Sequence, residues 1–229
     1  MAGVSKLIRE RKDEEDKAAN EAIQKAFEAH QKTQAEAATR AVELAKADPK
    51  SEIAADALAW AIQGLRGKPD AVKEAVGLLK EHHLGSPKIK SATEMIRYAG
   101  LPDEVVSDFL TAVSEKNPDK ATQATALMGL AEGYKAKAEP YGRPAPKDAA
   151  EWVKKAEETF ERVAREFGDV KSYGDTTFAE RAGGELYEMR NLAVGKVAPD
   201  IEGEDLDGDK FKLSDYRGKV VVIDFWGDW

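Results

Sequence analysis

Residues 219–229 read KVVVIDFWGDW, and this stretch decides which fold the C-terminal region can adopt. The run from Val220 to Ile223 follows an Arg-Gly-Lys turn and consists of β-branched residues, which favour strands. A short run that is apolar on both faces is typical of a strand buried inside a sheet with helical crossovers. No such sheet is predicted elsewhere in the 229 residues, so the sequence offers this strand no evident partner.

A hairpin is predicted just before this strand. The pair Asp207-Gly208 lies between the segments 200–206 and 209–213. Asp-Gly is a preferred pair for a two-residue β-hairpin turn, because both central residues of that turn need positive φ angles. We therefore predict two short strands joined by a two-residue turn.

Part of this region resembles the start of a calcium-binding loop, but the residues at the later loop positions do not fit such a loop. Asp205, Asp207 and Asp209 carry carboxylates at alternate positions, as the start of such a loop does. However, Lys210 occupies the position that requires glycine, and Tyr216 occupies that of the bidentate glutamate. No metal site is predicted there.

The histidines are equally weak candidates for a metal site. His82 and His83 are adjacent, so on a helix their side chains diverge by about 100° and cannot share an ion as an i, i+4 pair does. His30 is too distant in the sequence to support them. We interpret the adjacent pair as a solvated helix end.

Composition and charge exclude several classes of partner. The chain has enough residues for one large or two small domains. Its 43 acidic residues outnumber 35 Lys and Arg, and the net charge of −8 argues against nucleic acid and anionic membranes as partners. No run of 18 apolar residues occurs in the sequence, so no membrane span is predicted.

The sequence contains no cysteine. It therefore carries no disulfide, no thiolate metal site and no thiol nucleophile of its own. Phosphate-binding glycine loops, serine nucleophile elbows and paired-histidine zinc helices are missing from it as well. For the chain as given we predict no catalytic, cofactor-binding or metal-binding residue and no cofactor.

Residues from about Ser5 to Asn191 are predicted to form helices joined by short turns. Apolar residues recur there at helical spacing, and proline and glycine separate the segments. The predicted helices span residues 17–46, 51–64, 71–82, 91–98, 102–116, 121–138, 148–167 and 177–191. In the second helix Ser51 is the expected N-cap, and the expected buried stripe comprises Ile53, Ala57, Leu58, Trp60 and Ala61.

Two of these helices resemble a tetratricopeptide (TPR) helix pair. The residues at the matching positions are Leu130, Ala131, Tyr134, Ala156 and Phe160. The connection at 139–147 is far longer than the tight turn of a regular repeat, so the unit is degenerate. We therefore predict that residues 1–193 form an irregular array of α-helical hairpins, a TPR-like solenoid or bundle. Such an array suits a scaffold with a peptide or protein partner.

The C-terminal region resembles the opening of the thioredoxin-like disulfide reductases of the TlpA and redoxin (AhpC/TSA) type. Several short signals agree in order and spacing, namely Gly195 and Ala198-Pro199-Asp200 in the entry strand, Asp207-Gly208 in the hairpin, residues 213–219 (LSDYRGK) in the connection and Phe225-Trp226-Gly227-Asp228-Trp229 after the central strand. The commoner residues between the two Trp are Ala-Thr. The paired Trp favours the disulfide-reductase branch over the peroxiredoxins.

This resemblance implies a mainly α protein whose residues 194–229 are the N-terminal part of an incomplete thioredoxin-like α/β domain. In the family a Cys-x-x-Cys follows directly. Its first thiolate attacks a substrate disulfide, and its second cysteine resolves the mixed disulfide. Both cysteines would come after Trp229, so the chain as given is expected to be inactive. Only supporting roles carry over: Trp226 and Trp229 flank the start of the motif, and Phe225 packs beneath it.

Two functions remain in consideration. The first is the N-terminal part of a thiol-disulfide oxidoreductase of this antioxidant family, which acts on protein disulfides or thiols and is cut short before its cysteines. Family members work in the periplasm or cell envelope, which would require a signal sequence upstream of Met1, because residues 1–10 have no apolar stretch of signal-peptide length. The second is a complete TPR-like interaction module with a vestigial tail. Reading the coding sequence past codon 229 distinguishes the two.

The tail is also expected to be weakly structured by itself. The segment beyond Gly195 is shorter than the roughly 40 residues that an independent fold needs without disulfides or metals. A strand over 220–225 would leave both of its edges unpaired, with a high β propensity and a risk of aggregation. We expect these residues to be loosely held on the helical domain or disordered in isolation.

Overall fold

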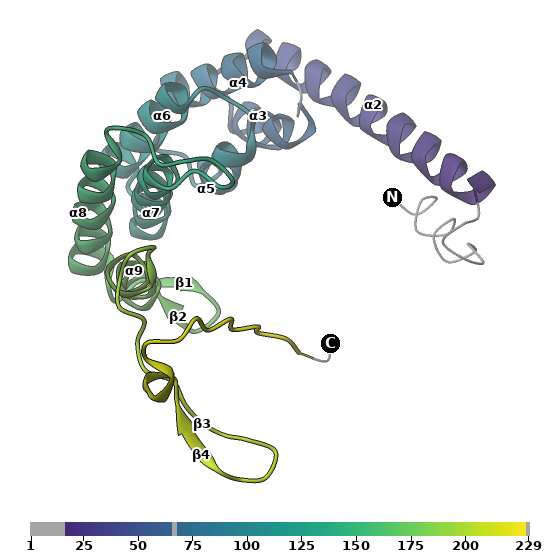
Figure 1. The fold of residues 1–229 in the computed structure, drawn as a ribbon. Helices are drawn as coiled ribbons and strands as arrows, with labels where there is room; N and C mark the ends of the chain where they lie inside the picture. Colours follow the sequence, from purple (N-terminus) through teal and green to yellow (C-terminus); the bar gives the residue numbers. More distant parts are fainter. Residues whose placement is uncertain (1–16, 66–67, 228–229) are drawn as a thin grey trace. The chain divides into compact units, whose positions relative to one another are not determined.

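A computed structural model of the protein describes residues 17–65 and 68–227 (Figure 1). The described part is mainly helical, as the sequence predicts. The chain divides after Gly183 into two compact units, a helical unit and a C-terminal unit. Each unit is described by itself. The predicted helix breaker Gly67 lies outside the described residues.

The helical unit confirms the predicted helices, with small shifts at their ends. In order they are α2 (Lys17–Ala47), α3 (Glu52–Gly64), α4 (Pro69–His82), α5 (Ile89–Met95) with the 3₁₀ turn η1 (Ile96–Tyr98), α6 (Asp103–Lys116), α7 (Lys120–Ala138) and α8 (Ala149–Phe167). A small antiparallel pair that the sequence did not predict follows, β1 (Lys171–Tyr173) and β2 (Thr176–Thr177). Strands of two or three residues are too short to show an alternating pattern. The next helix, α9 (Phe178–Tyr187), crosses the boundary between the units.

Successive helices of this unit pack on one another. Helix α2 contacts α3, α3 contacts α4 and α5, α6 contacts α7, and α7 contacts α8 (Figure 1). The largest fully buried side chains are Phe109, Phe160, Phe178, Leu58, Ile62, Leu65, Leu79, Ile89, Ile96, Leu110, Leu127 and Val72. Full burial of one such side chain contributes about 1.5–3 kcal/mol, so this core holds the array together.

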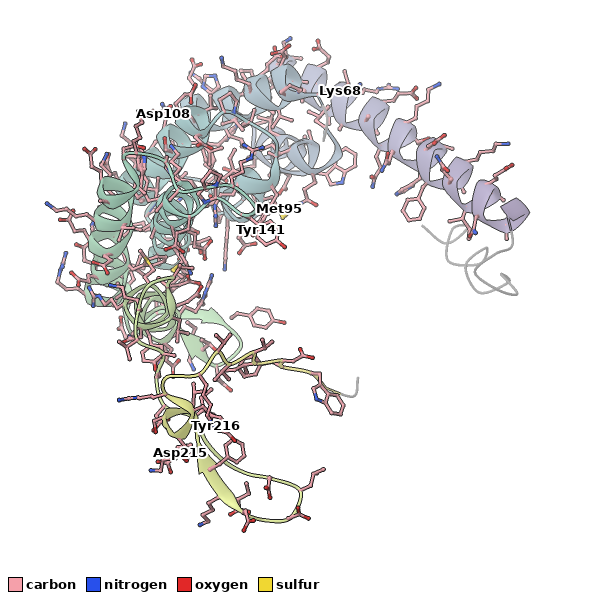
Figure 2. The ribbon with its side chains drawn as sticks, in the orientation of Figure 1. Lys68, Met95, Asp108, Tyr141, Asp215 and Tyr216 are labelled. Carbon is pink, nitrogen blue, oxygen red and sulfur yellow. The ribbon has the colours of Figure 1, made fainter. Side chains whose placement is uncertain are left out.

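Helices α7 and α8 share the most extensive helix–helix contact of the described residues. Ala131, Ala156 and Phe160 are fully buried, and Leu130 nearly so. The ring of Tyr134 stacks on Trp152, with 5.9 Å between centroids. The long connection is confirmed, and its Tyr141 is fully exposed (Figure 2). The tetratricopeptide-like pattern thus located two packed helices, and their assignment to that repeat class stays a prediction.

The predicted buried stripe of α3 is wrong in part. Ile53 is 79% exposed and Trp60 is 46% exposed. The buried residues of this helix are instead Ala54, Ala55, Leu58, Ala59, Ala61 and Ile62. The approach of α2 explains the difference, because a Cβ atom at Gly64 would lie only 2.9 Å from the Cβ of Ala38. So close an approach requires small side chains, whereas the sequence pattern assigned the large ones to the core.

Helix α7 begins at a side-chain cap. The Asp119 carboxylate accepts the Thr122 N–H at 2.8 Å and the Thr122 hydroxyl at 2.7 Å. Hydrogen bonds from the Thr122 hydroxyl and then from its N–H lower the pKa of Asp119 below its usual 3.8, against a smaller effect of burial. The carboxylate therefore stabilises the helix start in its charged form.

We expect Asp119→Ala to lower the free energy of unfolding by about 1 kcal/mol near neutral pH. The folded pKa is depressed, so this stabilisation is present above the unfolded value of about 4 and is lost as the pH falls through the folded value. Thermal unfolding of both proteins across this acidic range measures the effect. Asp119→Asn is the control, because it keeps an acceptor and does not titrate. A stability difference from Asp119→Ala that stays constant with pH would contradict the assignment.

The C-terminal unit continues from α9 into the π-helical turn η2 (Glu188–Leu192), so the predicted helix over 177–191 changes its winding near its end. Strands β3 (Glu202–Glu204) and β4 (Lys210–Lys212) then pair antiparallel, with Gly203 opposite Phe211. The 3₁₀ turn η3 (Leu213–Tyr216) follows (Figure 1). The predicted hairpin is present.

The predicted two-residue turn of this hairpin is wrong. Beyond the last ladder pair, Glu204 and Lys210, the Asp205 N–H donates to the Asp209 carbonyl at 3.0 Å, and the Gly208 N–H donates to the Asp205 carbonyl at 3.1 Å. Among the described residues only glycines have positive φ, so Asp207 cannot form the two-residue turn. The reason is the Asp205 side chain, which accepts the N–H groups of Asp207 and Asp209, both at 2.9 Å, and stabilises a wider turn.

The predicted central strand over residues 220–225 is not formed. Residues 220–227 form no β-ladder with any other described segment. Val220 and Val222 are almost fully exposed, whereas Val221 and Ile223 are about half exposed. A strand of the buried kind needs partners on both edges. Because the described residues of this unit supply none, the segment is extended but unpaired.

Candidate functional site

One side of the C-terminal unit gathers apolar side chains into what we call the apolar face. Its members are Ile201, Phe211, Leu213, Tyr216, Val221 and Ile223. Together with Val222, Asp224 and Phe225 they line a cavity of about 360 Å³ (Figure 2 labels Tyr216). All members of the apolar face except Leu213 are between 38% and 46% exposed, so they are only partly covered within the described structure.

The hairpin positions half of this face. Side chains alternate along a strand, so Phe211 lies on the opposite side of β4 from its neighbours Lys210 and Lys212. The Leu213 N–H donates to the Ile201 carbonyl at 2.9 Å, which extends the strand pairing by one bond.

The turn η3 is fixed by two aspartates. The Asp200 carboxylate accepts the Ser214 N–H at 2.8 Å and the Ser214 hydroxyl at 2.7 Å. These bonds, the hydroxyl first, hold the pKa of Asp200 below its ordinary value. Asp215 accepts the Lys212 N–H at 2.9 Å. Both carboxylates therefore stabilise the backbone of the turn.

A glycine directs the chain back along the hairpin. Gly218 has a φ of 82°, and the Lys219 N–H donates to the Tyr216 carbonyl at 3.1 Å. Only glycine adopts this φ readily. The Arg-Gly-Lys turn that the sequence predicts is thus confirmed, and it brings Val221 and Ile223 to the apolar face.

Of the supporting aromatic residues, Phe225 lines the same cavity at its exposed end. Phe225 and Trp226 are both 82% exposed. Trp229 lies outside the described residues. Residues 17–65 and 68–227 contain no group of three or more His, Asp or Glu side chains that could hold a metal ion. Within the same residues no helix is both long and apolar enough to cross a bilayer.

The interpretation of His82 and His83 as a solvated helix end is wrong for His83. That side chain is buried, and its Nε2 lies 2.7 Å from the Pro49 carbonyl oxygen. His82 instead lies 3.6 Å from Glu81. The partner of His83 is 34 residues away in the chain, so no local pattern could reveal it. The imidazole links the end of α4 to the loop before α3.

The C-terminal region is similar to known proteins. Residues 194–229 match the AhpC/TSA family. This match covers the hairpin, η3 and the unpaired segment 220–227. The class that the comparison supports for this region is therefore the thioredoxin-like redoxins.

Short stretches are also similar to particular disulfide oxidoreductases. The chain is 50% identical over 42 residues to the thiol-disulfide oxidoreductase ResA of Geobacillus thermodenitrificans, which is 18% of this chain and 24% of that protein. It is 52% identical over 42 residues to ResA of Geobacillus kaustophilus, with the same coverage. With ResA of Bacillus thuringiensis subsp. konkukian it shares 39% identity over 46 residues, 20% of this chain and 27% of that protein.

The chain thus spans about a quarter of the length of the curated relatives that it matches. No solved structure matches it. The similarity supports the redoxin family and the thiol-disulfide oxidoreductases within it for the C-terminal region.

Proposed function

We propose that this chain is the N-terminal part of a thiol-disulfide oxidoreductase of the redoxin family, in which a TPR-like helical domain precedes a thioredoxin-like domain. The family match begins at residue 194, and for this reason we place the domain boundary between 193 and 194. The substrates of the whole protein are protein disulfides or thiols. Its place of action is the periplasm or cell envelope.

The observation that carries the proposal is the agreement between the family match and the order of local structures. The hairpin, η3 with its Asp200 and Asp215 caps, the Gly218 turn and the extended segment all fall within residues 194–229. The half-exposed apolar face adds physical support. Each Å² of apolar surface removed from water contributes about 25 cal/mol, so the remaining elements of a thioredoxin-like domain would gain stability by covering this face.

The reaction belongs to cysteines that are not among the 229 residues. In a Cys-x-x-Cys pair a thiolate attacks the substrate disulfide, and the second thiol resolves the mixed disulfide. What this chain contributes is the scaffold: the hairpin and its turn place the extended segment whose Phe225 and Trp226 precede the expected motif.

The gene and its product test this proposal directly. We expect the coding sequence past codon 229 to continue into a Cys-x-x-Cys, and the longer product to reduce insulin disulfides in the presence of dithiothreitol. The 229-residue chain should show no rate above the dithiothreitol background, because it has no thiol. Replacement of the first cysteine of the longer product by serine is the matched control. An active longer product without that motif would overturn the proposal.

Limited proteolysis tests the expected weakness of the tail. Lys210, Lys212 and Lys219 lie in short strands or turns with exposed side chains, so we expect trypsin to cut there first. Lys154 and Lys155 in α8 should be cut much later, because α8 must unfold locally before cleavage. Mass spectrometry of the early peptides measures the order. Equal resistance of the two regions would show that the tail is firmly packed.

A second candidate function is a TPR-like interaction module with a vestigial tail. The packed α7–α8 pair favours it, because arrays of such pairs form extended binding surfaces. A stop codon directly after codon 229 in the genomic sequence, together with retained peptide binding, would select this function over the oxidoreductase.

A further inference from the structure

A groove lies in the helical unit between α6 and α7, and we call it the α6–α7 groove. Its volume is about 240 Å³. Its apolar lining includes Val106 and Leu110 from α6 and Gly133 and Ala136 from α7. Arg97 and Lys137 also line it. In the sequence this groove is signalled by two glycines, Gly129 and Gly133, inside the predicted helix 121–138.

Gly133 keeps the groove open. A Cβ atom added at this position would meet no other atom within 4 Å, so no close approach of a neighbour requires glycine here. Glycine inside a helix is less favourable than alanine by roughly 0.5–1 kcal/mol. Gly133 therefore leaves space for a side chain in the groove.

The charges around the groove favour an anion. The charged side chains of its lining are Arg97, Lys137 and Asp103, which gives an excess of one positive charge. Arg97 forms an ion pair with Glu132, but Arg181 also binds this carboxylate at 3.1 Å, so two guanidinium groups share one negative charge.

Lys137 contacts both a carboxylate and an aromatic ring. Lys137 lies 3.3 Å from Asp103 and 4.7 Å from the centroid of the Trp152 ring. Lys155 lies over the same ring at 4.5 Å. The ring of Tyr134, which lines the groove, stacks on Trp152, and the Trp152 indole N–H donates to the Asp148 carboxylate at 2.8 Å.

We propose that the α6–α7 groove binds a peptide segment that combines an acidic residue with an apolar side chain. The apolar side chain enters the space above Gly133, and the carboxylate pairs with Lys137. The volume of the groove suits one or two side chains rather than a folded domain. This binding site is independent of the proposed redox function, because no residue of the C-terminal unit takes part in it. Failure of one proposal therefore does not affect the other.

Fluorescence polarisation with three labelled octapeptides tests the site on the full chain. The peptides alternate leucine with glutamate, with glutamine or with lysine. We expect the glutamate peptide to bind at least about 10-fold more tightly than the glutamine peptide. The lysine peptide should not bind, and the difference should shrink at about 0.5 M salt, because salt screens exposed charges.

Two pairs of variants locate the binding. Gly133→Leu should fill the groove and weaken binding of the glutamate peptide at least about 10-fold, while leaving the helical content intact. Its control is Gly77→Leu, because Gly77 is also helical with no atom within 4 Å of an added Cβ, but lies in α4. Lys137→Gln should weaken binding by a similar factor, and Lys154→Gln on the exposed side of α8 should not.

Three results would overturn the proposal. They are the absence of binding of the glutamate peptide to the unmodified chain, equal binding of the glutamine peptide, and unchanged affinity in Gly133→Leu. Circular dichroism of each variant shows whether a loss of binding reflects a filled groove or an unfolded protein.

Discussion

Phe160→Ala is expected to lower the free energy of unfolding of the helical unit by about 3–5 kcal/mol. Phe160 is fully buried in α8, which packs against α7 through the most extensive helix contact of the described residues. Removal of the ring loses its transfer from water and leaves a cavity that rigid helices cannot close fully. Urea unfolding followed by far-ultraviolet circular dichroism measures the loss.

Tyr141→Ala is the matched control for this substitution. Tyr141 is also aromatic and lies in the loop between the same two helices, but its side chain is fully exposed. Its removal should change the stability by no more than about 0.5 kcal/mol. If Phe160→Ala cost no more than Tyr141→Ala, the α7–α8 contact would not be part of the core.

Glu132→Ala is expected to cost about 2 kcal/mol, the second largest effect. Its carboxylate accepts hydrogen bonds from Arg97 and from Arg181, and Arg181 also donates to the Ser172 hydroxyl at 2.6 Å. Without Glu132 the two partly buried guanidinium groups would repel each other with no counter-charge. Breaking a buried pair costs about 3–5 kcal/mol, and the partial exposure of these groups reduces that figure.

Glu158→Ala is the control for this ion pair. Glu158 lies 3.8 Å from Lys154 in an exposed i, i+4 pair on α8, which should contribute about 0.5 kcal/mol or less. Thermal unfolding compares the two variants, and about 1 kcal/mol corresponds to roughly 2–4 °C in a protein of this size. Equal melting temperatures would show that Glu132 does not join η1, α7 and α9.

Local sequence patterns were sufficient where a feature depends on neighbouring residues. Ser51 was predicted as the cap of α3, and its hydroxyl accepts the Ala54 N–H at 3.2 Å. The long connection after α7 and the Gly218 turn were also predicted. Each of these features depends on residues within a few positions, where backbone geometry leaves few alternatives.

Apart from the hairpin turn, which the nearby Asp205 side chain changes, the errors arose where a distant neighbour decides the outcome. The buried side of α3 depends on how closely α2 approaches, and that distance favours alanines over Ile53 and Trp60. The burial of His83 depends on Pro49. The α6–α7 groove depends on two helices and on the absence of a side chain at Gly133.

The sequence by itself determined the helices, the hairpin and the resemblance of residues 194–229 to the redoxins, because caps, turns and residue order are local properties. The tertiary structure alone decided which helix faces are buried, how Glu132 joins Arg97 to Arg181, and that residues 220–227 are extended without a strand partner among the described residues. These outcomes depend on contacts between residues far apart in the chain. Such contacts form only when whole elements pack, and packing responds to the shape and charge of both partners.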